Sequence, residues 1–288
     1  MTAAALDTFL HATLGRTGRR VHRLGISASY GLDAAGVEHA IERGVNYLYW
    51  GSLRTEPFAE GVRRAVARGK RDELVVVLQS YVRFGWMLGP SICRALKRLG
   101  LDSADVLLLG WWNKEPPGRI VDAALRLRER GLVKHLALST HERPLIPRLA
   151  PGSPFDLFHV RYNAAHRGAE REVLDALPAA PAERPGLVAF TATRWGTLLK
   201  PLAGEPADTR VPSAGDCYRF ALSNPKVDVV MTGTGGLEQM KAALDAVEKG
   251  PMTGDELAWI RARGDRVHEA ARRKGPLSAS YWRSASAH

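Results

Sequence analysis

The sequence predicts an α/β protein built as a closed (β/α)8 TIM barrel, with an N-terminal β-hairpin before the barrel and an extra C-terminal helix after it. Eight short apolar runs alternate with helical segments almost to the end of the 288 residues. The runs lack polar alternation, which is typical of strands covered on both faces in a parallel sheet. Several helical segments end at a glycine (Gly44, Gly69, Gly100, Gly131), as helix C-caps do. Eight strand–helix units favour a closed barrel over an open doubly wound sheet, which remains the alternative.

The expected strands are short and rich in β-branched residues or leucine. In chain order they are Leu24–Ser27, Asn46–Tyr49, Leu74–Gln79, Val106–Leu109, His135–Leu138, Leu157–Val160, Leu187–Phe190 and Val229–Met231. The helical segments between them are Ala34–Glu42, Pro57–Ala67, Pro90–Leu99, Gly118–Arg130, Ala169–Leu177, Cys217–Leu222 and Leu237–Val247. Two proline-rich tracts, Pro144–Pro154 and Pro178–Pro185, are expected to be connections.

Two further elements flank the barrel. Thr13–His22 is expected to form a hairpin, turned by Gly15 and Gly18, that covers the barrel floor. Gly254–Arg273 is expected to form the extra helix, because its apolar residues recur on one face. No linker or long repeat interrupts the pattern, so we expect one domain over residues 1–288.

The composition excludes several classes of protein. Charged residues make up 25% and hydrophobic residues 45% of the chain, near the averages for globular domains, which excludes a disordered chain, a disulfide scaffold and a coiled coil. The formal net charge is +11, but the arginines occur as singles and doublets rather than in one basic block. Nucleic acid is therefore not expected as a partner, and a field that attracts small anions is the more modest inference.

Cysteine usage and hydropathy bear on location. Cys93 and Cys217 stand alone, without a C-x-x-C motif, which fits a reducing cytoplasm. The N-terminus lacks the apolar run of a secretory signal, and nowhere do 18 apolar residues follow one another. We expect a cytoplasmic protein with no membrane partner; the sequence does not indicate its oligomeric state.

Ligands of such barrels bind at the C-terminal ends of the strands, and the residues expected there are rich in aromatic rings and arginine. The candidate substrate-binding residues are Trp50, Trp111, Trp112, Arg161, Tyr162, Arg194 and Trp195. The alternatives are that the tryptophans cap the barrel core and that the arginines pair with a loop acid such as Glu115 or Glu142.

Two weaker patterns lie at the same end. His141, His159 and His166 raise the question of a metal site, but no H-x-E-x-H motif accompanies them, and we expect none. The run TGTGG (232–236) follows an expected strand and opens a helix, which is typical either of a phosphate-binding loop or of a plain turn.

The order of seven segments resembles the aldo-keto reductase superfamily over nearly the whole chain. These segments are LGRTGRRVHRLG, AIERGVNYLYWGS, DVLLLGWW, LALST, VRYNAAHR, LVAFTATRWGTLL and NPKVDVVMTGTGGLEQMKAAL. The resemblance implies the (β/α)8 fold and, in ordinary members, reduction of carbonyl groups by NADPH.

The four catalytic residues that the resemblance implies are all replaced. Where the family has its aspartate, tyrosine, lysine and histidine, this sequence has Tyr49, Arg54, Ser80 and Gly110. A positioned proton donor typically contributes 10²–10⁴-fold to such a reaction. Arg54 cannot take that role, because a guanidinium keeps its proton above pH 12.

The cofactor positions that the resemblance implies are also altered. Gln239, Ala242 and Ala243 stand where the family binds the adenosine end, and His159 and Phe190 stand at the nicotinamide. Ser139 is the one cofactor contact kept, with Thr140 in place of asparagine. The remaining candidates for binding a phosphate are Ser139, Thr191, Thr193, Gly233 and Thr234. We therefore expect no cofactor, or weak binding of NAD(P)H.

The sequence thus predicts an atypical aldo-keto-reductase-like barrel that has lost ordinary NADPH-dependent reduction and binds or transforms a small organic molecule, anionic or aromatic, at its mouth. Tyr49, Tyr81 and His141 are the candidate acid–base groups of an enzyme that works without a cofactor. Two alternatives stay open: an NAD(P)H-dependent oxidoreductase with a different proton donor, and a non-catalytic binding or regulatory protein.

Overall fold

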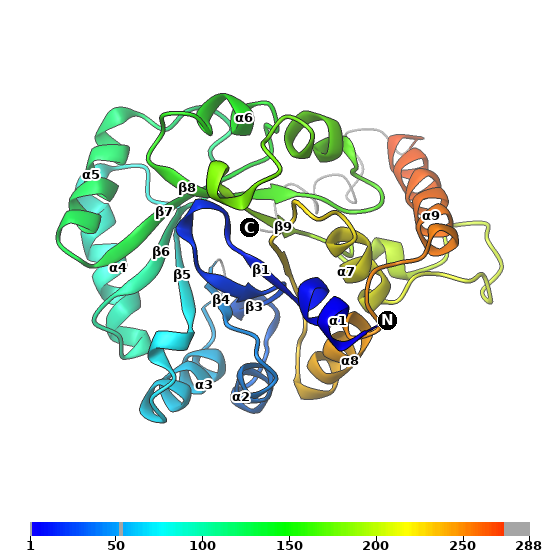
Figure 1. The fold of residues 1–288 in the computed structure, drawn as a ribbon, viewed down its shortest axis with the longest axis horizontal. Coiled ribbons are helices and arrows are strands. Elements are labelled where there is room, and N and C mark those ends of the chain that lie inside the picture. Colours follow the sequence, from blue (N-terminus) through cyan, green and yellow to red (C-terminus); the bar gives the residue numbers. More distant parts are fainter. Residues whose placement is uncertain (1, 52–53, 274–288) are drawn as a thin grey trace.

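The computed structural model describes residues 2–51 and 54–273. Eight parallel strands close into a barrel in the order β10-β3-β4-β5-β6-β7-β8-β9, which confirms the (β/α)8 fold and excludes an open sheet (Figure 1). The strands are β3 Leu24–Ser27, β4 Tyr47–Trp50, β5 Val75–Ser80, β6 Ala104–Leu109, β7 Val133–Thr140, β8 Phe155–Arg161, β9 Gly186–Phe190 and β10 Val229–Met231. Every expected strand is present, with ends that shift by one or two residues except in β3 and β10.

The helices surround the barrel. They are α2 Ala34–Glu42, α3 Glu56–Ala67, α4 Gly85–Leu99, α5 Gly118–Glu129, α6 Leu145–Leu149, α7 Ala214–Leu222, α8 Leu237–Val247 and the extra helix α9 Gly254–Arg273. The helices differ from the expected elements in several places. Helix α4 begins at Gly85 rather than Pro90, and α7 begins at Ala214 rather than Cys217. A helix α1, Ala3–Leu10, precedes the hairpin; α6 lies inside a tract expected to be a connection; and a π-helix, Glu170–Leu174, stands within the segment expected as a regular helix.

The hairpin covers the barrel floor, as predicted. Strands β1 (His11–Thr13) and β2 (Arg20–His22) pair antiparallel and lie across the N-terminal end of the barrel (Figure 1). Leu14 and Val21 are buried and join the apolar cluster that fills the barrel interior. A Cβ on Gly15, whose φ is +47°, would lie 2.1 Å from the backbone nitrogen of Gly186, so only glycine allows the hairpin to sit this close.

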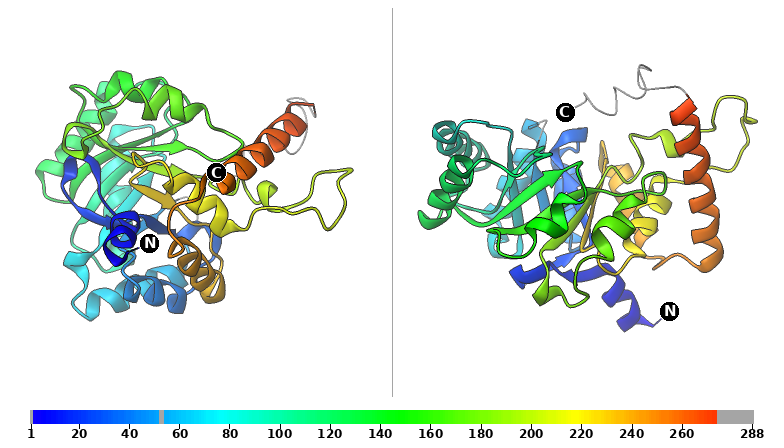
Figure 2. Two further views of the ribbon diagram at one scale, coloured as in Figure 1. Left: turned by 45° about the vertical axis from the view of Figure 1, so that its right-hand side comes forward. Right: turned by 90° about the horizontal axis from the view of Figure 1, so that it is seen from above.

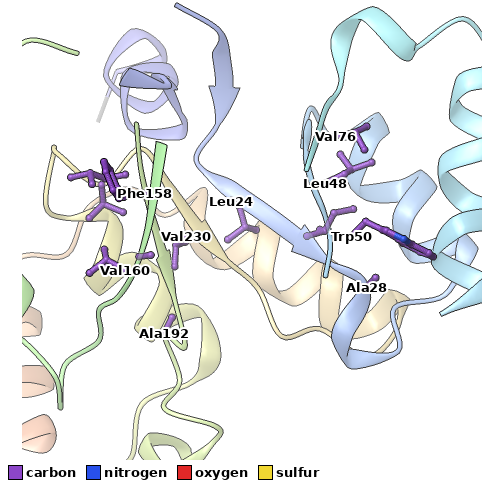
Figure 3. Close-up of a cluster of buried hydrophobic side chains, with 14 of the residues drawn as sticks. Leu24, Ala28, Leu48, Trp50, Val76, Phe158, Val160, Ala192 and Val230 are labelled. Atoms are coloured by element: carbon purple, nitrogen blue, oxygen red, sulfur yellow. The ribbon is translucent and has the colours of Figure 1, made fainter. Parts of the chain in front are cut away.

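The core has two layers, because successive residues of a strand point to opposite faces. Inward side chains fill the barrel, and outward ones pack against the helices. Figure 3 shows part of the outer layer, which includes Leu48, Trp50 and Val76. This alternation sets which residues at each strand end can face the mouth.

A buried ion pair ties the floor together. The guanidinium of Arg184 and the carboxylate of Asp228 form two hydrogen bonds of 2.8 and 2.7 Å, and both side chains are about 1% exposed. Asp228 also accepts a hydrogen bond from the backbone N–H of Leu187 at the start of β9. The charges are therefore paired and bonded, as buried charges must be.

Helix α9 runs along the outside of the barrel beyond α7 (Figure 2). Its Arg263 is fully buried and pairs with Glu205 at 2.6 Å, which fastens the long segment between η6 (Thr197–Leu199) and α7. Among the helices described, none is both long and apolar enough to cross a membrane.

Candidate functional site

The candidate site is the barrel mouth, at the opposite end from the hairpin. Inward-facing positions near the strand ends bring together residues far apart in the sequence. Tyr49 comes from β4, Gln79 from β5, His159 from β8 and Phe190 from β9. These side chains lie above the apolar interior and form the base of the mouth.

Tyr49, Gln79 and Arg54 form one hydrogen-bonded group. The hydroxyl of Tyr49 donates to Oε1 of Gln79. The guanidinium of Arg54 donates to the backbone oxygen of Gln79 at 2.5 Å and to that of Gly51 at 3.3 Å. A Cβ on Gly51 would lie about 2 Å from the ring of Tyr49 (1.9 Å from Cε1), so the glycine makes room for the tyrosine.

Gly110, at the end of β6, makes room in the same way. A Cβ there would lie 2.5 Å from Nε2 of Gln79 and 2.8 Å from Cε1 of Tyr81. The amide of Gln79 and the ring of Tyr81 therefore occupy the space that a side chain at position 110 would take. Tyr81 itself is partly exposed, just past β5.

A buried pair lies below this group. The hydroxyl of Tyr47 and Nε2 of His159 share a hydrogen bond of 2.8 Å, and both side chains are buried. Burial lowers the pKa of His159 to about 3, so the ring is neutral at physiological pH. Burial also raises the pKa of Tyr47 well above its usual value. This pair supports the mouth from beneath.

An aromatic row, formed by Phe190, His141, Trp111 and Tyr81, crosses the mouth. His141 meets Phe190 edge to face at 5.6 Å between ring centroids and Trp111 at 6.1 Å. Its backbone N–H donates to Oδ1 of Asn113 at 2.9 Å. The ring of Tyr81 lies against Gly110, the residue that precedes Trp111 in the chain. The row links the ends of β5, β6, β7 and β9.

The backbone of the mouth is strained. In the described part of the chain, four residues other than glycine have a positive φ: Trp111 (53°), Thr191 (58°), Arg194 (52°) and Trp195 (52°). All four follow β6 or β9 at the mouth. A left-handed conformation costs a residue with a side chain roughly 1–2 kcal/mol, and such strain gathers at functional sites. The backbone N–H of Trp111 is held by Oγ of Ser139 at 2.8 Å.

Three arginines at the mouth, Arg54, Arg83 and Arg194, have no ion pair with a carboxylate among the described residues. Arg54 and Arg83 donate to backbone oxygens and Arg194 donates to Thr197, so the predicted alternative of a loop acid is not found for Arg194. Burial lowers the pKa of each of the three. Arg83 stacks over Trp112 at 4.2 Å and donates to the backbone oxygens of Gly110 and Trp111. An anion in the mouth would lower the free energy of these partly desolvated charges.

The cationic cluster is our term for Arg161, at the end of β8, and Arg194, which follows the neighbouring strand β9. Burial and the charges of Arg161 and Arg194 lower the pKa of His166 to about 2, so this ring is neutral. Nδ1 of His166 lies 3.3 Å from Oδ1 of Asn163, and its ring meets His268 of α9 edge to face at 5.7 Å. The cluster thus lies where the β8 and β9 ends approach α9.

Some predicted site residues do not face the mouth. Trp50 is 1% exposed and packs against Phe58 of α3 in the outer layer, because it follows the inward-facing Tyr49 and so points outward. Tyr162 is equally buried, and its hydroxyl donates to Glu170 at 2.7 Å. Trp112 packs partly against the outer core, whereas Trp195 is half-buried after β9.

The predicted phosphate-binding residues are engaged with the protein itself. Gly233 donates its N–H to the hydroxyl of Tyr218 at 3.2 Å, and the buried hydroxyl of Thr234 contacts the sulfur of Met240. Thr191 donates its hydroxyl to the backbone oxygen of Phe190, and Oγ1 of Thr193 accepts from the N–H of Gly196. Oγ of Ser139 accepts from the backbone N–H of Trp111 at 2.8 Å.

No group of three or more His, Cys, Asp or Glu side chains in the described residues is arranged to hold a metal ion. Sequence reasoning did not identify Gln79, Arg83 or Tyr47 as parts of the mouth. Every second residue of β4 and β5 points into the barrel. Counting residues along these strands would have identified Tyr47 and Gln79 as inward-facing.

Comparisons with known proteins agree with this architecture. The model of the aldo/keto reductase family matches residues 37–205. Aldo-keto reductase AKR11C1 from Bacillus halodurans superposes with a TM-score of 0.70 in its holo form, at 18% identity, over 88% of this chain and 95% of the other. Its apo form matches at 21% identity with the same TM-score and coverage. A putative 2,5-diketo-D-gluconic acid reductase B matches with a TM-score of 0.68 at 20% identity, over 89% and 92% of the two chains. At these identities the likeness concerns the fold.

Proposed function

Because the chain belongs to the aldo/keto reductase family, we propose that it is an atypical member that has lost NAD(P)H-dependent carbonyl reduction and binds a small organic anion at its barrel mouth. The proposal has two parts. The first concerns the chemistry that the mouth lacks, and the second concerns the ligand that its charges would accept.

The arrangement of Tyr49, Gln79, Arg54 and Gly110 carries the first part. Reduction of a carbonyl by hydride places charge on the oxygen, which needs a proton donor beside it. At the position of the family's proton donor, Arg54 is bonded to backbone oxygens and has no proton to give near neutral pH. The hydroxyl hydrogen of Tyr49 is engaged by a neutral amide. Ser80, where the family's lysine would stand, is 1% exposed.

Two backbone N–H groups of the glycine loop (residues 232–236) already donate hydrogen bonds within the protein, which supports the loss of nucleotide binding. The N–H groups of Gly233 and Gly235 bond to Tyr218 and to the side chain of Gln239, at 3.2 and 2.8 Å. A pyrophosphate would have to break both bonds before it gained its own. These bonds disfavour the binding of a nicotinamide nucleotide at this loop.

Three arginines of the mouth carry the second part. Arg54, Arg83 and Arg194 are partly desolvated, and a guanidinium binds carboxylate or phosphate through two parallel hydrogen bonds. Arg194 has one N–H, at Nε, that is buried without a partner in the described residues. If the bound anion is transformed, the imidazole of His141 and the hydroxyl of Tyr81 are the groups beside it that can move a proton.

Calorimetric titration tests both parts. We expect no binding of NADPH or NADH tighter than about 100 μM, and we expect benzoate or hexanoate to bind. Arg194→Gln should weaken the binding of the carboxylate about tenfold or more. Arg128→Gln, which removes an exposed arginine at the floor end of α5, is the matched control and should leave it unchanged.

Tight binding of NADPH together with carbonyl-dependent oxidation of the nucleotide would overturn the first part and favour an oxidoreductase with a different proton donor. Equal carboxylate affinity in the wild type and Arg194→Gln would overturn the second part.

A further inference from the structure

The exposed apolar side chains of this protein gather at one sector of the mouth. In the described residues, the large hydrophobic side chains that remain exposed all follow β3, β5 or β6. They are Tyr30, Tyr81, Phe84, Trp86, Met87 and Trp111. Trp86 is 77% exposed and Phe84 is 57% exposed. Contiguous exposed apolar surface of this kind marks binding sites, whereas single exposed residues need no explanation.

Phe84, Trp86 and Met87 form an outer patch on the first turn of α4. Leu88 of the same turn is fully buried and anchors it. A Cβ on Gly85 would lie 2.8 Å from the backbone oxygen of Arg119, so the start of α4 packs closely against the start of α5. The outer patch is therefore presented by a fixed backbone.

The aromatic row connects the outer patch with the cationic cluster. At the end of β9, the ring centroid of Phe190 lies 5.6 Å from that of His141, which lies 6.1 Å from that of Trp111. Tyr81 follows beside Gly110, and the chain then runs through Arg83 into the outer patch. At the other end, β8 and β9 pair Arg161 with Phe190. One edge of the mouth is thus apolar along its length and cationic at its far end.

We propose that the ligand is an elongated amphiphilic carboxylate: its charged group binds at the cationic cluster, its body lies along the aromatic row, and its apolar end covers the outer patch. This rests on the proposed function, which places an organic anion in the mouth. The inference adds the shape of that anion and a subsite on α4 that lies outside the barrel.

Charge complementarity favours this occupant over an apolar one. Arg83 lies between the row and the outer patch without a carboxylate in the described residues, and the first turn of α4 has no acidic residue. A neutral apolar molecule would cover the rings but bring no carboxylate to Arg83 or Arg194.

A homologous series of n-alkanoates, from butanoate to hexadecanoate, tests the inference by calorimetry at constant ionic strength. We expect the affinity of the wild type to rise with chain length by up to about fourfold per methylene. Trp86→Ala should lower the affinity for hexadecanoate, whose extended chain is long enough to pass the aromatic row, about tenfold and leave that for butanoate within about twofold. Trp259→Ala, which removes an indole of α9 that stacks with Arg210 on the other side of the barrel from α4, is the matched control and should change neither.

The outcomes separate this inference from the proposed function. Suppose that butanoate binds and that Arg194→Gln weakens its binding. The inference alone is then overturned if affinity does not depend on chain length, or if Trp86→Ala has no effect. No binding of any alkanoate overturns both. Equal affinity for n-decanol and decanoate contradicts the amphiphilic ligand. If the wild type sediments as a dimer and the Trp86→Ala variant sediments as a monomer, the outer patch is instead a contact between two copies of the chain.

Discussion

Tyr49 and Gln79 bond to each other across the boundary between β4 and β5. The strand register pairs Tyr49 with Val77, so Gln79 lies two residues further toward the mouth on the same inward face. The hydroxyl of Tyr49 donates to the side-chain oxygen of Gln79 rather than toward a bound ligand. The centre of the mouth is therefore closed by a neutral hydrogen-bonded pair, and the charged groups stand around it.

Gly110→Ala should destabilise the protein, because the added Cβ would meet Gln79 at 2.5 Å and Tyr81 at 2.8 Å. Overpacking of this kind costs typically 1–3 kcal/mol, and we expect a loss of about that size in the free energy of unfolding, measured with urea. Gly118→Ala is the control, since no atom lies within 4 Å of its Cβ position. If the two variants are equally stable, the packing at the mouth is looser than described.

Tyr47→Phe should lower the free energy of unfolding by about 1–3 kcal/mol, because it leaves Nε2 of the buried His159 without its partner. Tyr30→Phe, at a tyrosine that is 47% exposed, should change stability by less than about 0.5 kcal/mol. An unfolding midpoint for Tyr47→Phe that matches the wild type would contradict the buried hydrogen bond.

Stability should fall with acidification through His159. The pKa of this group is about 3 in the folded protein and about 6.5 in the unfolded chain, so between these values the unfolded chain binds more protons. The free energy of unfolding therefore decreases as the pH falls from about 6.5 toward 3, by up to about 1.4 kcal/mol per pH unit from this residue.

His159→Gln removes that contribution, so its stability should depend less steeply on pH between 4 and 6 than that of the wild type. Carboxylates contribute equally in both proteins and cancel in the comparison. Parallel stability–pH curves would mean that the ring is protonated in the folded state.

Asp228→Asn should destabilise strongly, because it leaves the guanidinium of Arg184 buried without a counter-charge. The loss of one member of a buried pair costs about 3–5 kcal/mol. The exposed Asp208 provides the control, and Asp208→Asn should have little effect by thermal unfolding. A small effect at both positions would show that water reaches Arg184 in solution.

The fold could be predicted from the sequence because its signal is carried by whole segments. Apolar runs and glycine caps recur in each strand–helix unit, so errors at single residues do not change the topology. The elements that were missed depend on local features instead. Helix α1 relies on the side chain of Thr2 as its N-cap, and α6 is only five residues long within a proline-rich tract.

The site could be predicted only to the level of its rim. Trp111 and Arg194 follow strands at the mouth, but Trp50, the last residue of β4, and Tyr162, directly after β8, are buried in the outer layer. Neighbouring residues of a strand point to opposite faces. A strand end that is predicted with an error of one residue therefore does not show which side chain faces the mouth. Gln79 was missed for the same reason, because it lies inside its strand.

A crystal structure of the protein soaked with both NADPH and hexanoate tests the central claim most directly. Our account predicts density for the carboxylate beside Arg194 and Arg161, with the hydrogen bond between Tyr49 and Gln79 intact and no nucleotide at the glycine loop. A nicotinamide ring above Tyr49, with the bonds of Gly233 and Gly235 opened toward a pyrophosphate, would contradict it.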